Sequence, residues 1–234
     1  SYDLVEALCS MPNLTELTLG MLFHEEFYSA LKAYASSIQV QALKLHHLQC
    51  STPASSYDLV EALCSMPNLT ELTLGMLFHE EFYSALKAYA SSIQVQALKL
   101  HHLHCFTCAS SYDLVEALCS MPNLTDLTLE MYLTEEFYSV LKAKASSIQV
   151  QTLKLDVLQC PKPASLHHLI EALGYMPKLT YLTLKGNLNE EFYSTLKAKA
   201  SSIQVQTLEL DDVRCPTPAS SHHLAEALCY MPNL

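Results

Sequence analysis

The sequence predicts an α/β solenoid with a curved parallel sheet on its concave side and helices on its convex side. The chain repeats every 55 residues without insertion or deletion, as shown by Tyr2, Tyr57, Tyr112, His167 and His222. Each period contains two strand patterns, and a helical pattern follows each of them. Because one such unit cannot bury its apolar side alone, successive units must stack. We expect residues 1–234 to form a single array of about eight units.

The strand patterns read LTELTL and VQALKL, and they begin at Leu14 and Val40 in the first period. They recur at Leu69, Val95, Leu124, Val150, Leu179 and Val205. Because side chains alternate across a strand, the leucines should point into the core and the residues between them should face the concave side.

A first helix is expected over residues 25–38, reading EEFYSALKAYASSI. Phe27, Leu31 and Ala35 recur at every fourth position and would share the buried face. The second helix of each period reads SSYDLVEALCSMP, with an apolar stripe at Leu59 and Leu63. We expect a capping box at its start, with Ser55 as the cap and Asp58 three residues later, and a stop at Pro67.

These units resemble leucine-rich repeats of the ribonuclease-inhibitor type, which form horseshoes. The sequence segments MPNLTDLTL and ALCSMPNL most resemble the repeat regions of NOD-like receptors, which are intracellular innate-immune proteins. The resemblance implies a protein-recognition scaffold, the ligand-sensing or autoregulatory segment of such a receptor. One departure concerns the ninth position of each unit, where the family usually has Asn or Cys. Here it is mostly apolar, as at Leu22 and Leu48, so we expect the turns after the strands to differ.

Charge and cysteine content limit the possible partners. Asp and Glu number 24 against 13 Lys and Arg, a net charge of −11, which disfavours nucleic acid and suits a basic protein partner. No apolar run approaches the roughly 18 residues that span a bilayer, and no secretory signal begins the sequence, so we expect no membrane association. Eight of the nine cysteines recur at two repeat positions, which suits buried thiols in the cytoplasm. The Asn-Leu-Thr sequons, such as that at Asn13, leave secretion as an alternative.

The outward strand positions are the candidate binding surface. They comprise Glu16, Lys44, His46, Glu71, Lys99, His101, Asp126, Lys154, Asp156, Tyr181, Lys185, Glu209 and Asp211. A partner should contact the later strands, where Tyr181, Lys185, Glu209 and Asp211 replace residues of the earlier copies and a tyrosine offers an anchor. We expect the main role of these charges to be pairing with one another across strands about 4.8 Å apart, with partner contact as their second role.

Metal binding and catalysis are the other chemical possibilities for these residues. The segment HHLHCFTC holds His101, His102, His104, Cys105 and Cys108, which resembles a zinc-binding set, but His101 should face the concave surface and the ligands would not converge. Four glycines in the whole chain provide no phosphate-binding loop, and no catalytic constellation stands out from the repeat. We expect no cofactor, no metal and no enzymatic activity.

Two other functions remain open on sequence grounds. The segments at either end lack polar capping repeats, so units could stack head to tail into a filament through heterologous contacts. An inhibitor or regulator of an enzyme, such as a ribonuclease or a small GTPase, could use a similar horseshoe. The fold alone does not choose among them.

Overall fold

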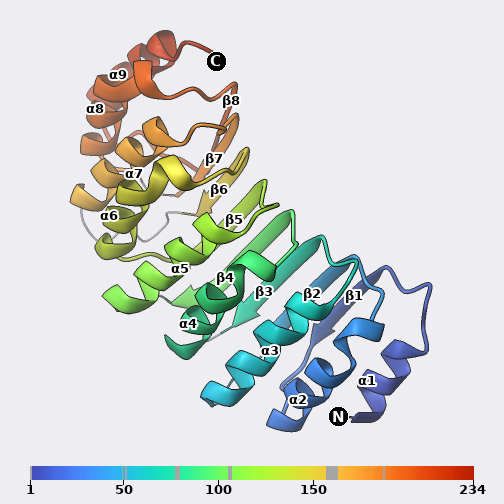
Figure 1. Ribbon diagram of the computed structural model, residues 1–234. Helices are drawn as coiled ribbons and strands as arrows, with labels where there is room; N and C mark the ends of the chain where they lie inside the picture. Colours follow the sequence, from blue (N-terminus) through green and yellow to red (C-terminus); the bar gives the residue numbers. More distant parts are fainter. Residues whose placement is uncertain are drawn as a thin grey trace.

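The computed structural model describes residues 2–48, 50, 52–76, 80–104, 107–156, 163–186 and 188–234. Strands and helices alternate along the whole chain (Figure 1). The strands are β1 (Glu16–Gly20), β2 (Ala42–Leu48), β3 (Glu71–Met76), β4 (Ala97–His104), β5 (Asp126–Tyr132), β6 (Thr152–Asp156), β7 (Tyr181–Lys185) and β8 (Thr207–Asp211). The helices are α1 (Tyr2–Cys9), α2 (Glu25–Tyr34), α3 (Pro53–Ser65), α4 (Glu80–Tyr89), α5 (Cys108–Ser120), α6 (Glu135–Lys144), α7 (Pro163–Tyr175), α8 (Glu190–Lys199) and α9 (Pro218–Tyr230).

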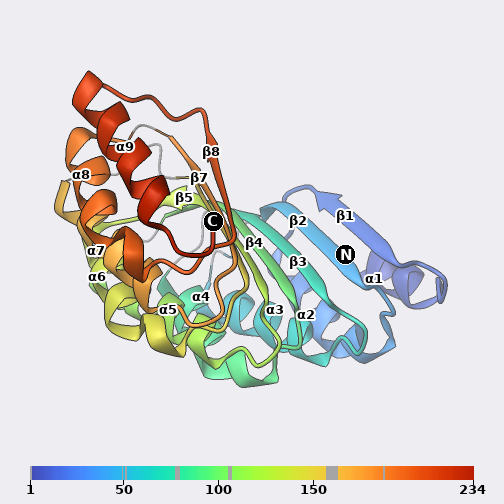
Figure 2. The same cartoon turned by 90° about the horizontal axis from the view of Figure 1, so that it is seen from above.

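The strands form one sheet in chain order, and every neighbouring pair is parallel. Figure 2 shows the helices along the outside of the arc and the strands along its inside. The predicted α/β solenoid, with a concave parallel sheet and convex helices, is therefore confirmed. The two ends of the chain lie at opposite ends of the arc (Figure 1).

Leucines align with leucines across the sheet, and they build the core. Leu43 of β2 pairs in register with Leu72 of β3, and Leu72 pairs with Leu98 of β4. Each of these three side chains is 2% exposed, as predicted for the inward positions. Burying a leucine side chain contributes roughly 1.5–3 kcal/mol, so the repeated ladder stabilises the sheet along its whole length.

The helix of the first unit kind is shorter than expected. Helix α2 ends at Tyr34, and a 3₁₀ turn over Ala35–Ser37 replaces the last predicted helical turn. The tighter turn lets the backbone N–H of Ile38 donate to the carbonyl of Ala35 at 3.1 Å, which satisfies an acceptor at the helix end. The buried face includes Phe27 and Leu31 as predicted, together with Tyr28.

The helix of the second unit kind begins earlier than expected. Its cap is Thr52 and not Ser55, because the Thr52 hydroxyl accepts the backbone N–H of Ser55 while the Ser55 hydroxyl accepts that of Thr52. Pro53 then occupies the first helical position, where an N–H would have no helical partner. Asp58 is therefore no part of the cap, so the predicted capping box was wrong.

The turn after the strand also has its own conformation. His47 and Asp212, which occupy the same position of the repeat, have positive φ angles of 58° and 50°. In β2 the register shifts between His46 and Leu48, so the backbone leaves the ladder at this residue. The apolar ninth position had predicted a turn that differs from the one usual in the family. The side chains of several ninth-position residues lie outside the described part of the chain.

The cysteines are less uniformly buried than expected. The seven described ones are free thiols. Cys50 is fully buried, and burial raises the pKa of its thiol to about 11. Cys215 and Cys229 are exposed, contrary to the expectation of buried thiols at the repeat positions; Cys108, which lies outside those positions, is exposed as well. Cys105 and Cys160 lie outside the described residues.

Candidate functional site

All the predicted outward side chains lie on the concave face, and none of them is buried. Their register forms straight rows across the sheet. The row at the carboxyl end of the strands runs through Gly20, His46, Gly75 and His101 and then reaches Glu130. It continues from Asp156 to Lys185 and Asp211 on the later strands. The concave face therefore changes along this row from glycine and histidine to charged residues.

A shallow concavity lies over the later strands. It has a volume of about 370 Å³ and its wall is mainly polar. The lining residues are Thr128, Glu130, Lys154, Leu155, Asp156, Thr183, Lys185, Glu209 and Asp211. Four carboxylates and two ammonium groups give it a formal charge of −2. The hollow therefore brings together most of the later-strand residues that the sequence singled out.

Tyr181 lies beside this hollow and is held by charged neighbours. The ammonium of Lys154 lies 5.6 Å from the centroid of its ring, within the range of a cation–π contact. A hydrogen bond from the phenol to Glu209 lowers the pKa of that carboxyl, and the same bond raises the pKa of Tyr181. Thr183 also donates to Glu209, at 3.1 Å between the two oxygens. These contacts fix the tyrosine ring in place without burying it.

Charge pairing across the concave strands was the main role expected for these charges, and it occurs in part. Lys99 contacts Glu130 at 2.7 Å, and Lys185 lies 3.5 Å from Asp211. Both pairs are well exposed, so each contributes at most about 1 kcal/mol to stability. The predicted residues Glu16, Glu71 and Asp126 lie exposed at strand starts. They line the same face but lie away from the hollow, as does Lys44.

Sequence reasoning missed a contact between two histidines. Nδ1 of His46 lies 3.0 Å from Nε2 of His101, although β3 separates their strands. The side chains meet over Gly75, the register partner of both. A signal was available in the sequence, because the histidines are one period apart and a glycine occupies the strand position between them.

The zinc-like segment is only partly described. His101 faces the concave side as expected, and Cys108 is exposed in the first turn of α5. The side chains of His102 and His104, as well as Cys105, lie outside the described residues. Among those that are described, no group of three or more His, Cys, Asp or Glu residues is placed to hold a metal ion.

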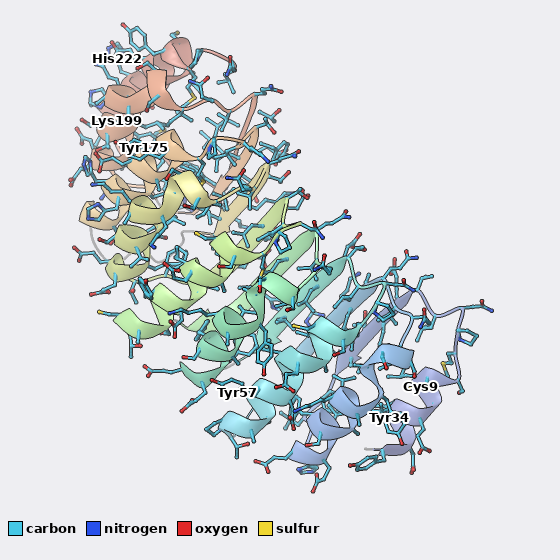
Figure 3. The ribbon with its side chains drawn as sticks, in the orientation of Figure 1. Cys9, Tyr34, Tyr57, Tyr175, Lys199 and His222 are labelled. Carbon is cyan, nitrogen blue, oxygen red and sulfur yellow. The ribbon has the colours of Figure 1, made fainter. Side chains whose placement is uncertain are left out.

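The convex face carries a second set of ion pairs that the sequence interpretation did not contain. Each pair joins the two helix kinds: Lys32 contacts Asp58 at 2.9 Å and Glu61 at 2.5 Å. In the third copy the equivalent contact joins Lys142 to Glu171 at 2.6 Å, and Glu171 also lies 3.5 Å from Lys199. Figure 3 shows Tyr34 and Tyr57 on the early helices and Lys199 and His222 on the late ones. The convex surface therefore also changes chemistry along the array.

Comparison with known protein families finds no match, and comparison with curated proteins finds no significant similarity. In the described part of the chain, no helix is both long and apolar enough to cross a bilayer. The concave face offers a partly exposed tyrosine, a shallow polar hollow and paired charges, which are features suited to binding a macromolecular surface.

Proposed function

We propose that this chain is a leucine-rich-repeat module of the ribonuclease-inhibitor type, and that it recognises a protein partner through its concave face. The observation that carries this proposal is the hollow over β5–β8. Its lining unites Glu209 and Asp211 with Lys154 and Lys185, and Tyr181 lies at its side. The units surrounding it repeat the same interior, so the variation is concentrated at the surface.

The partner that fits best is a protein with a basic contacting segment. The hollow has an excess of carboxylates, and the whole chain carries a net charge of −11, which would steer a basic partner toward it. Tyr181 would anchor the contact, because a tyrosine provides a large apolar face at little cost in conformational entropy. A role as the sensing or autoregulatory segment of a cytoplasmic NOD-like receptor would be consistent with such a surface.

Affinity purification with wild-type and variant chains tests the proposal. The test variants are Tyr181→Ala and the double charge reversal of Glu209 and Asp211 to lysine, and the control reverses Glu16 and Glu71 on the early strands. We expect a specific partner, once identified by mass spectrometry and purified, to bind the test variants at least roughly tenfold more weakly, as the loss of a binding anchor implies. Unchanged affinity in both test variants would contradict this placement of the site.

Self-association is a second candidate function. Leu208 and Leu210 of β8 are only partly buried, whereas the equivalent Leu43 and Leu45 of β2 are 2% and 0% exposed. Leu17 and Leu19 of β1 are also only partly buried. A second copy could cover these edges by head-to-tail contact, which would extend the sheet. Light scattering over a range of concentrations tests this, because a constant monomer mass would contradict it.

A further inference from the structure

The pair formed by His46 and His101 is placed by the repeat itself. The two residues occupy the same position in consecutive periods, on β2 and β4, and their side chains point to the same concave face. Strands two apart would normally keep such side chains from touching. Here the intervening register position is Gly75, which has no side chain to separate them.

The separation of the two ring nitrogens suits a chelated metal ion. Nδ1 of His46 and Nε2 of His101 are 3.0 Å apart, and the ring centroids are 4.9 Å apart. This short separation places one nitrogen of each imidazole within reach of a single ion. An ion bound about 2.1 Å from each nitrogen would be held at an N–metal–N angle of about 90°. This is the angle between neighbouring ligands in square-planar or octahedral coordination.

We propose that His46 and His101 chelate one late transition-metal dication, with Cu²⁺ or Ni²⁺ preferred to Zn²⁺. Imidazole nitrogens in a square or tetragonal arrangement favour Cu²⁺ and Ni²⁺, whereas Zn²⁺ favours the wider tetrahedral angle. Water completes the coordination, because no third protein ligand among the described residues is placed to do so. Lys99, two residues before His101, pairs with Glu130, the register neighbour of His101.

Metal binding would replace the hydrogen bond that the rings now share. In the metal-free pair, one imidazole donates its N–H and the other accepts it. The metal requires an unprotonated nitrogen from each ring, so the donating ring must move its proton to its other nitrogen.

Gly75 provides a test that leaves both ligands in place. A Cβ atom at this position would lie 2.1 Å from Cε1 and 2.3 Å from Nε2 of His101, so the ring would have to leave its position. Gly20 is the matched control, because a Cβ there would meet only the Cβ of His46 at 4.0 Å, an ordinary contact. The two glycines occupy the same position of the repeat, on β3 and β1.

Calorimetric titration with Ni²⁺ at neutral pH is the experiment. We expect wild type and Gly20→Ala to bind one ion per chain with the same affinity, and His46→Ala, His101→Ala and Gly75→Ala each to bind roughly tenfold more weakly or worse. Circular dichroism confirms that each variant is folded, and electron paramagnetic resonance of the Cu²⁺ complex should show two nitrogen ligands. Because every chain keeps its exposed thiols, their background is common to all the titrations.

Three results would overturn the proposal. The first is wild-type affinity that neither histidine variant reduces, which would place Ni²⁺ elsewhere on the chain. The second is an equal loss of affinity in the Gly20 and Gly75 variants, which would show that the close approach over Gly75 is irrelevant. The third is a Cu²⁺ spectrum with a single nitrogen ligand.

Discussion

Strands β1–β4 and strands β5–β8 share one interior and present two different surfaces. Leu72 and Leu74 of β3 are 2% and 0% exposed, and the equivalent Leu182 and Leu184 of β7 are each 1% exposed. On the concave face, however, the first half carries Gly75 where the second half carries Lys185. The buried leucines define the scaffold. The residues of the concave face can therefore vary without disturbing it.

The helices on the convex side also combine a contact that both halves share with surface residues that differ between the halves. The lysine of the first helix kind pairs with a carboxylate of the second kind in both halves, as Lys32 does with Glu61 and Lys197 does with Glu226 at 2.7 Å. Around these pairs, Tyr34 and Tyr89 of the first half are replaced by Lys144 and a second lysine, Lys199, in the second half. One helix–helix contact is therefore kept while the chemistry of the surface around it is changed.

The largest expected effect comes from breaking the shared interior. Leu74→Ala and Leu184→Ala should each lower the free energy of unfolding by about 2–5 kcal/mol, because both create a cavity in the core. The outward neighbours Thr73→Ala and Thr128→Ala should change it by no more than about 0.5 kcal/mol. Urea denaturation followed by circular dichroism measures both sets. An outward substitution as costly as an inward one would contradict the assignment of faces.

Helix caps test whether the two halves also share their local structure. Thr52→Ala and Thr217→Ala should each cost about 1 kcal/mol of stability, because each threonine accepts the backbone N–H three residues later. Thr→Ser at either position keeps the acceptor and should restore most of this loss. Urea denaturation would refute the assigned cap if the alanine and serine variants at Thr52 were equally stable.

Acid should destabilise the convex ion pairs. Hydrogen bonds from lysines lower the pKa of Glu171 and of Glu226 below the ordinary 4.5, so their folded forms hold protons less readily than their unfolded forms. The resulting stability is present above about pH 4.5 and is lost as the pH falls through the folded-state pKa values. We expect the urea midpoint to fall in this window, and to fall less in Glu171→Gln. A variant with the same acid response as wild type would contradict this contribution of Glu171.

The smallest expected effect concerns the concave ion pairs. Glu130→Gln breaks the pair that joins β4 to β5, and Asp211→Asn breaks a pair within the second half. Each should change stability by less than about 1 kcal/mol, because both pairs are exposed. Raising the salt concentration should shrink even this difference. Denaturation at two ionic strengths measures it. A larger, salt-independent loss would indicate that these charges belong to the scaffold and not to the variable surface.

The scaffold could be predicted from sequence because its determinants are local and repeated. Alternating leucines fix which side of each strand is buried, and stacking at a constant period aligns Leu43 with Leu72. The second helix start was misplaced because Thr52 and Ser55 can both cap a helix, and Pro53 decides between them. Sequence spacing alone did not favour one.

The contacts between units were harder to predict. The pairing of Lys32 with Asp58 depends on how neighbouring helices face one another, and strand spacing does not determine that. The approach of His46 to His101 needs side-chain reach across a whole strand, and the missing Cβ of Gly75 makes it possible. The hollow near Tyr181 combines predicted residues such as Lys154 with Glu130, which the sequence had not singled out.

The central claim is that outward residues of successive units lie side by side on one parallel sheet. Thr73 of β3 and Lys99 of β4 are register partners, so their Cα atoms should be about 4.8 Å apart, within the range that a disulfide spans. We predict that Thr73→Cys with Lys99→Cys forms a cross-link on mild oxidation, identified by the mass of the joined peptides, and that Thr73→Cys with Lys154→Cys on β6 does not. Efficient cross-linking of the distant pair, or none of the adjacent pair, would contradict the solenoid register.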